Sequence, residues 1–295
     1  MAFSSHHGRA QLIDPATITI ARDSFGVPHI FAPTDAAAAY GLAWATCEDH
    51  FPFVQEALLP SRTLLSRHKK KEGLLMDFAM KFLGIDTLVA QRYALDLSPE
   101  FRKVLEAYVQ GINDYARTHP KEVIEKHLFP LNPQDVIAGY VLTGSLMAGV
   151  GMALRALRED QLSLYFEPHE TGSNAVAIAP SRTEDSRTWL LINSHQPNEG
   201  RFAWYEAHVY SEEGTNILGA LFPGSVTVLT GVNPFLGWAH TNNYHMLGDI
   251  YQLRVRGRRY WLDGQWIPFS LRRVRLHWLI GRTSIPFKKK LLYSV

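Results

Sequence analysis

The chain has only one cysteine, Cys47, among its 295 residues. A single cysteine excludes an internal disulfide framework and a thiolate zinc site, and it leaves the redox compartment open. The sequence also lacks a GxSxG elbow, an HExxH helix, a Walker A loop and a GxGxxG fingerprint. Its 13 histidines are scattered without ligand-like pairing on one helix face, so most are interpreted as solvated or core residues.

Neither a strong charge nor a long hydrophobic run stands out. Lys and Arg total 30 against 28 Asp and Glu, so no global field indicates nucleic acid or a membrane surface. No apolar run approaches the roughly 20 residues of a membrane span. The first 15 residues have no basic region followed by an apolar stretch, which predicts no secretory signal and, for a complete chain, a cytoplasmic location.

Basic residues do gather near the end of the sequence. From Arg254 onward, 11 Lys or Arg residues accompany one acid, Asp263. Nucleic-acid binding is one interpretation. The alternation of Arg273 and Arg275 with Val274 and Leu276 instead favours the solvated face of a strand. We also interpret the three lysines at 69–71 as a surface loop.

The first 172 residues are predicted to be mostly helical. Residues 17–31 read as two short strands around a Gly-Val-Pro break, and residues 34–65 have helical composition. Ser98, Pro99 and Glu100 form a helix start, with a capping serine, proline at the first position and an acid in the first turn. Another helical stretch runs over residues 133–166.

The pattern changes at Gly172. Residues 173–180 and 188–193 are typical of buried strands joined by a polar turn, and further strands are expected within 202–211, 225–232, 236–242, 249–257 and 258–266. The chain therefore divides into a helical segment, 1–172, and a strand-rich segment, 173–295. This order of helices and then strands favours an α+β fold.

Ser173 is the candidate that matters most for chemistry. A serine directly after a glycine, at the start of an apolar strand, has a purely structural interpretation, in which the glycine makes the turn and the serine begins the strand. The motifs around Ser173 instead favour a catalytic interpretation, because together they resemble those of a known family. They are, in order, RDSFGVPHI at 22–30, YGLAWA at 40–45, LINSHQP at 191–197, WYEAH at 204–208, FPG at 222–224, GVN at 231–233 and GWAHTN at 237–242.

This series resembles the penicillin acylase family of N-terminal-nucleophile (Ntn) hydrolases. The motifs at 22–45 resemble the start of that family's α chain, and those after Gly172 resemble the start of its β chain. His195 and the YEAH motif are more similar to the acyl-homoserine-lactone and aculeacin acylase branch. The resemblance implies the αββα four-layer sandwich of Ntn hydrolases, incomplete here, with two sheets between helical layers.

The resemblance also implies an activity. Family members cleave themselves before a serine, here between Gly172 and Ser173, and their α and β chains remain associated. The product is an amidohydrolase for an acyl amide of penicillin type or N-acyl-homoserine-lactone type, which would serve antibiotic metabolism or quorum quenching. A non-catalytic acylase-like scaffold or inactive fragment is the alternative. The partner is a small-molecule substrate, with no nucleic acid and no membrane.

Four residues receive roles from the resemblance. Ser173 is the nucleophile, and its freed α-amine, with an ordinary pKa of about 7.7–8.0, is the general base. The backbone N–H of Asn242 is an oxyanion donor, His195 orients the amine or substrate, and Asn174 braces the cleavage loop. Asn242 as a turn residue and His195 as a loop histidine remain alternatives.

The remaining expectations concern metal binding, substrate specificity, the length of the chain and its location. No cofactor is required. A structural calcium ion bound through Asp249 is an alternative, although its usual acidic partner falls at Met246. Four aromatic residues are candidates for lining the acyl-binding pocket, and each is equally plausible as a residue of the hydrophobic core. They are Phe31, Phe202, Trp204 and Phe235. The family's β chain extends much further and carries a second oxyanion donor there, so this chain is expected to be a truncated, inactive precursor. The resemblance implies a periplasmic or extracellular location.

Overall fold

The computed structural model describes residues 12–159, 161, 172–241, 251–280 and 283–293. The chain divides into two compact units, each formed by three separate segments. Unit 1 contains residues 1–58, 91–136 and 171–242, and unit 2 contains residues 59–90, 137–170 and 243–295. Each unit therefore combines segments from both sides of Gly172. The predicted division into segments 1–172 and 173–295 concerns a cleavage step, and it stays a prediction.

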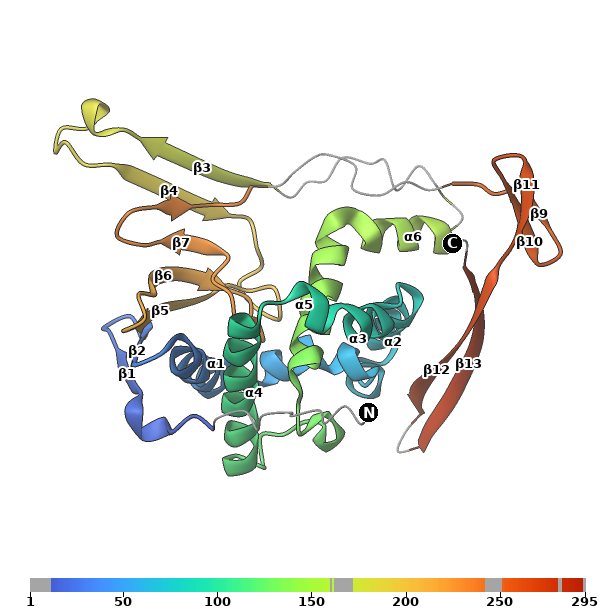
Figure 1. The fold of residues 1–295 in the computed structure, drawn as a ribbon, viewed down its shortest axis with the longest axis horizontal. Coiled ribbons are helices and arrows are strands. Elements are labelled where there is room, and N and C mark those ends of the chain that lie inside the picture. Colours follow the sequence, from blue (N-terminus) through green and yellow to red (C-terminus); the bar gives the residue numbers. More distant parts are fainter. Residues whose placement is uncertain (1–11, 160, 162–171, 242–250, 281–282, 294–295) are drawn as a thin grey trace, which may run out of the picture. The chain divides into compact units, whose positions relative to one another are not determined.

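Unit 1 is built on a six-stranded sheet (Figure 1). Its strands are, in spatial order, β1 (Thr19–Arg22), β2 (Pro28–Ala32), β5 (Tyr205–Ser211), β6 (Asn216–Leu221), β7 (Thr230–Val232) and β8 (Gly237–Trp238). Every pair is antiparallel except β2–β5, which is parallel with His29 opposite His208. This one pair joins the strands before Gly172 to the strands after it.

Two glycines let β6 and β7 approach closely. Gly219 lies opposite Gly231 in the register. A Cβ atom at Gly219 would stand 2.2 Å from the carbonyl oxygen of Thr230, and one at Gly231 would stand 2.4 Å from that of Leu218. Any larger residue at either position would have to move backbone, so this part of the sheet requires glycine.

Helices α1 (Asp35–Leu58) and α4 (Pro99–Thr118) cover this sheet, α1 packing on β2 and β5 and α4 on α1 (Figure 1). Ser98 caps α4 as predicted, since its Oγ accepts from the N–H of Phe101 at 3.1 Å. Gly111 makes the crossing possible, because a Cβ atom there would lie 2.7 Å from the Tyr40 carbonyl oxygen. The 3₁₀ turns η1 (Pro15–Thr17) and η3 (Lys126–Leu128) complete these helical segments.

A partly exposed polar network joins α1 to strands β1 and β5 of this sheet. The Tyr205 hydroxyl on β5 donates to Asp49 Oδ2 at 2.7 Å, and Arg22 at the end of β1 donates to the same oxygen at 2.8 Å. Arg22 also reaches Glu48 at 3.1 Å. Burial and the hydrogen bond to Asp49 raise the pKa of Tyr205, which stays a neutral donor. Segments before and after Gly172 thus share one carboxylate.

Unit 2 is a helical cluster with two small sheets. Its helical elements are η2 (Leu59–Arg62), α2 (Ser66–Phe82), α3 (Ile85–Asp96, shared with unit 1 from Gln91), α5 (Pro133–Ser145, from Ile137), the π-helical turn η4 (Leu146–Val150) and α6 (Gly151–Glu159). Buried side chains from three helices form its core, namely Ala79, Met80, Ile85, Val89, Ala138 and Leu142. Its strands are β9 (Val255–Arg256), β10 (Arg259–Leu262), β11 (Gln265–Pro268), β12 (Ser270–Ile280) and β13 (Thr283–Tyr293).

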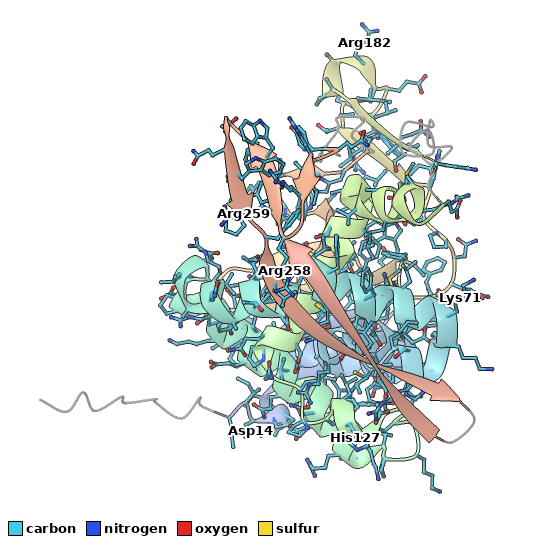
Figure 2. The ribbon with its side chains drawn as sticks, turned by 90° about the vertical axis from the view of Figure 1, so that its right-hand side faces the viewer. Asp14, Lys71, His127, Arg182, Arg258 and Arg259 are labelled. Carbon is cyan, nitrogen blue, oxygen red and sulfur yellow. The ribbon has the colours of Figure 1, made fainter. Side chains whose placement is uncertain are left out.

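Two sequence-based expectations are wrong in this region. The lysines at 69–71 are exposed, as predicted, but they lie within the bounds of α2 and not in a separate loop. Lys69 and Lys70 leave the helical conformation there and form a kink, with a φ of 47° at Lys70. Lys71 is exposed (Figure 2). The second expectation was that no apolar run approaches the length of a membrane span. The helical run Pro133–Ala156, of 24 residues, is long and apolar enough to cross a membrane by length and composition. Core helices of soluble proteins pass the same test, so the run assigns no membrane.

The predicted α+β class is confirmed, and most predicted elements are present. The strands at 17–31, the helix from residue 34 and the hairpin after Gly172 occur as β1–β2, α1 and β3–β4. The expectation that the two hairpin strands are buried is wrong, because most residues of β3 and half of those of β4 are exposed. Strand β6 was not predicted. Its sequence, NILGAL, carries a glycine that lowers strand propensity, and the need for that glycine arises only from β7.

The shared carboxylate predicts a stability effect for Tyr205→Phe. Removing the hydroxyl deletes a hydrogen bond to a charged group, which typically contributes about 1.5–3 kcal/mol. We expect the free energy of unfolding, measured by urea titration, to fall by about 2 kcal/mol. Tyr210→Phe is the matched control, on the outward face of the same strand, and should change it by less than about 0.5 kcal/mol. Equal effects of the two substitutions would contradict the role of the network.

The buried carboxyl group of Asp77 in unit 2 should make the free energy of unfolding depend on pH. This carboxylate is fully buried and accepts from the backbone N–H groups of Leu65 and Ser66 at 3.2 and 2.9 Å. Burial raises its pKa from 3.8 to about 6, although the hydrogen bonds from Ser66 and Leu65 oppose the shift. The folded state therefore binds a proton more tightly than the unfolded chain between about pH 4 and 6, so rising pH costs stability there.

Asp77→Asn should remove this dependence. From pH 4 to pH 7 the wild-type chain should lose about 2 kcal/mol of unfolding free energy relative to the variant. Urea titrations of both proteins at several pH values measure this difference. Parallel pH profiles would show that the buried carboxyl keeps an ordinary affinity for protons.

Candidate active site

The candidate site lies at the open end of a two-stranded hairpin in unit 1. Strands β3 (Ser173–Ile178) and β4 (Trp189–Ser194) are antiparallel, with Ser173 opposite Ser194 and Asn174 opposite Asn193. A turn with a short 3₁₀ segment, η6 (Pro180–Arg182), closes the far end, where Arg182 is exposed (Figure 2). The sequence folds this way because apolar strand residues flank a polar turn on both sides. The register then brings Ser173 beside the segment that follows β4.

Ser173 is the first residue of β3 and is half-buried. Its hydroxyl donates to the carbonyl oxygen of Gly172 at 2.7 Å. The nucleophile candidate is therefore held against the carbonyl of the peptide bond that sequence analysis predicts to be cleaved. A serine hydroxyl becomes a nucleophile for such a carbonyl group once a base takes its proton.

His195 lies over the same peptide. The Asn174 amide nitrogen donates to His195 Nε2 at 3.1 Å, so Nε2 accepts and Nδ1 carries the hydrogen. A Cβ atom on Gly172 would stand 3.6 Å from Nδ1 and 3.9 Å from Cε1 of that ring. The imidazole thus faces Gly172 across the strand pair, held there by Asn174. The structure brings together three of the predicted residues, Ser173, Asn174 and His195.

Two predicted residues lie outside the described part of the chain. Asn242 and Asp249 both fall within residues 242–250, which the structure does not describe. The oxyanion role of Asn242 and the calcium role of Asp249 stay predictions. Within the described residues, no group of three or more His, Cys, Asp or Glu side chains is arranged to hold a metal ion.

The four aromatic pocket candidates do not form one cluster. Trp204 stacks on Phe222 with ring centroids 4.4 Å apart, and Phe202 contacts the same ring edge-on at 6.0 Å. Phe31 instead packs against His208 and Tyr210 on the outward face of the sheet. Phe235 is almost fully exposed. These positions leave the acyl-binding surface unassigned.

Sequence reasoning missed two groupings that the fold creates. One is the network of Arg22, Asp49 and Tyr205 described above. The other is the pair His29 and His208, whose Nδ1 atoms lie 3.0 Å apart. Each histidine belongs to a motif quoted above, but 179 positions separate them, and only the parallel pairing of β2 with β5 brings them together.

Known proteins resemble the chain over most of its length. The family model for penicillin amidase matches residues 17–285. The acyl-homoserine lactone acylase PvdQ of Pseudomonas savastanoi pv. phaseolicola is 24% identical over 95% of this chain and 40% of its own length. PvdQ of Pseudomonas fluorescens Pf-5 is 26% identical over 85% of the chain and 37% of its own length.

Two more distant matches belong to the same group of enzymes. Aculeacin-A acylase of Actinoplanes utahensis is 23% identical over 75% of this chain and 33% of its own length. Among solved structures, a thermostable penicillin G acylase from Alcaligenes faecalis covers 50% of this chain and 87% of its own, at 19% identity. Its TM-score of 0.34 is too low to bear on the fold.

The chain thus spans about 40% of the length of the curated relatives it matches. The match to the family model, by contrast, covers nearly all of the chain, from the first strand of unit 1 into β13. The chain belongs to the penicillin amidase family.

Proposed function

We propose that this chain supplies the nucleophile of an acyl amide hydrolase and that Ser173 is that nucleophile. The observation that supports this most directly is the position of the Ser173 hydroxyl, 2.7 Å from the Gly172 carbonyl oxygen, beside a histidine fixed by Asn174. Relatives named for acyl-homoserine lactone and aculeacin A support an acyl group joined to an amine as the substrate class.

The first proposed step is self-cleavage. Ser173 Oγ gives up its proton and attacks the carbonyl carbon of Gly172. The C–N bond then breaks, and the Ser173 nitrogen takes up a proton. Water hydrolyses the resulting ester, which releases the Gly172 carboxylate and restores the Ser173 hydroxyl. The Ser173 nitrogen is now a free α-amine, directly beside the hydroxyl that it activates.

Turnover uses the same two groups. The α-amine accepts the Ser173 proton through a water molecule, and Oγ attacks the substrate carbonyl. The amine product leaves with a proton, and water releases the acid from the acyl-enzyme. The backbone N–H of Asn242 is proposed to stabilise the oxyanion, a contribution of about 2.7–4 kcal/mol for one donor in the type example. His195 would orient the amine, since its ring already faces Gly172.

The pairing of β2 with β5 supports continued association of the two pieces after cleavage. Four residue pairs, from His29 with His208 to Ala32 with Ser211, join one strand on each side of Gly172. Helix α1 packs on both strands, and Asp49 accepts from Arg22 and Tyr205 at once. None of these contacts involves the peptide bond that is cut. We also infer a periplasmic or extracellular location from the resemblance, with quorum quenching or antibiotic metabolism as the setting.

Replacing Ser173 tests this proposal without a known substrate. The wild-type chain should separate into two masses whose sum exceeds that of the chain by one water, with the second piece beginning at Ser173. Ser173→Ala should stay whole because it has no attacking hydroxyl. Intact-mass spectrometry after denaturation measures both.

Ser194→Ala is the matched control, since Ser194 lies directly opposite on β4, and it should be cleaved like the wild type. A folded wild-type chain that never splits would leave a non-catalytic acylase-like scaffold. Cleavage in Ser173→Ala would assign the reaction to another residue.

A further inference from the structure

His29 and His208 form a matched pair on the outward face of the unit 1 sheet. On β5 the neighbours of His208, Ala207 and Val209, are buried toward α1, so His208 points away from that helix. His29 lies directly opposite on β2. The two Nδ1 atoms are 3.0 Å apart, and the rings meet edge-on at 75°.

The outer nitrogens of both rings face oxygens that can only accept. Nε2 of His208 donates to the side-chain carbonyl of Asn216 at 2.9 Å. Nε2 of His29 faces Asp23 Oδ2 at 3.7 Å, within ion-pair range. A neutral imidazole carries one hydrogen, so each Nε2 that bears it leaves a lone pair on Nδ1. His208, which donates from Nε2 to Asn216, has this lone pair on Nδ1, and a hydrogen on Nδ1 of His29 completes the 3.0 Å contact as a hydrogen bond. A metal ion that takes the place of this hydrogen would bind to both Nδ1 atoms.

The position of Asp23 is itself fixed. Its Oδ1 accepts from the backbone N–H groups of Phe25 and Val27 at 2.9 and 3.0 Å, in the turn between β1 and β2. That leaves Oδ2 directed at His29. The carboxylate therefore adds negative charge beside the histidine pair without being a direct neighbour of either Nδ1.

We propose that the His29–His208 pair binds a divalent transition-metal ion between the two Nδ1 atoms. Histidines that ligate metals almost always donate their other N–H to a carboxylate or carbonyl. His208 does so to Asn216 at 2.9 Å, and the carboxylate of Asp23 lies 3.7 Å from the corresponding nitrogen of His29. With metal–nitrogen bonds of about 2.05 Å, nitrogens 3.0 Å apart subtend about 94° at the ion. An angle near 90° fits octahedral or square-planar ions such as Ni²⁺ and Cu²⁺, and fits tetrahedral zinc less well.

The remaining coordination positions fall to water. No third His, Cys, Asp or Glu completes a metal-holding group within the described residues. The His29 side chain is 30% exposed, so an ion can enter and keep part of its hydration shell. The Phe31 ring stands edge-on to His208 at 5.9 Å and limits access from one side. The ion would link a strand before Gly172 to one after it, and would stabilise the folded state by mass action.

Nickel binding to the whole chain tests the site. The parent protein carries His6→Gln and His7→Gln, because adjacent histidines near the N-terminus could bind metal themselves. Calorimetric titration with NiCl₂ should show one equivalent per chain. His29→Gln or His208→Gln should each weaken it by at least about 10-fold, whereas the exposed His68→Gln should leave it unchanged.

Asn216 provides a second, independent series. Asn216→Leu removes the acceptor for His208 Nε2 and should weaken nickel binding by about 10-fold, and Asn216→Asp, which keeps an acceptor, should restore it. The Cu²⁺ electron paramagnetic resonance spectrum of the parent needs no variant at the pair and should show coupling to imidazole nitrogen. A parent without saturable nickel binding, equal affinity in the histidine variants, or a copper spectrum with oxygen donors alone would overturn the proposal.

Discussion

The parallel pairing of β2 with β5 is the constraint on which unit 1 depends. It is the only parallel pair in the six-stranded sheet, and it joins residues that lie about 180 positions apart. Helix α1 packs across both strands, and the carboxylate of Asp49 receives donors from both sides of Gly172. None of these contacts involves the Gly172–Ser173 bond.

The hairpin β3–β4 contributes little to the hydrophobic core. Its pairing instead positions the polar side chains of the candidate site. Most of β3 is exposed, yet its first residue is held by a hydrogen bond to the preceding carbonyl. The register places Asn174 within reach of His195, one residue beyond the end of β4. Strand pairing and the hydrogen bond from Asn174 to His195 therefore bring three polar side chains together at one peptide bond.

Local chemistry explains which parts could be predicted from the sequence. The start of α4 was predictable because Ser98 and Pro99 act within a single turn, and the β3–β4 hairpin because its apolar strands flank a polar turn. Ser173, Asn174 and His195 were selected through family motifs, and the structure brings them together. Strand β6 was missed because the reason for Gly219 lies on another strand.

Long-range contacts explain what could not be predicted. His29 and His208 look unrelated in the sequence, and Tyr205 gives no sign that it reaches Asp49. The lysines at 69–71 read as a loop by charge, whereas the structure places them at a kink within α2. For His29 and for Tyr205 the deciding partner lies on another element. Polar pairs of this kind need the fold first, whereas caps and strand patterns do not.

The central claim is that Ser173 is an activated nucleophile, and covalent labelling tests it most directly. A reactive acylating probe with a good leaving group needs less transition-state stabilisation than an amide, so labelling reports on the serine itself and not on turnover. Peptide mapping after exposure to the probe should locate one acyl group on Ser173, with Ser194 unmodified and no adduct in Ser173→Ala. A folded chain that remains unlabelled at Ser173, or that is labelled equally in Ser173→Ala, would contradict the account.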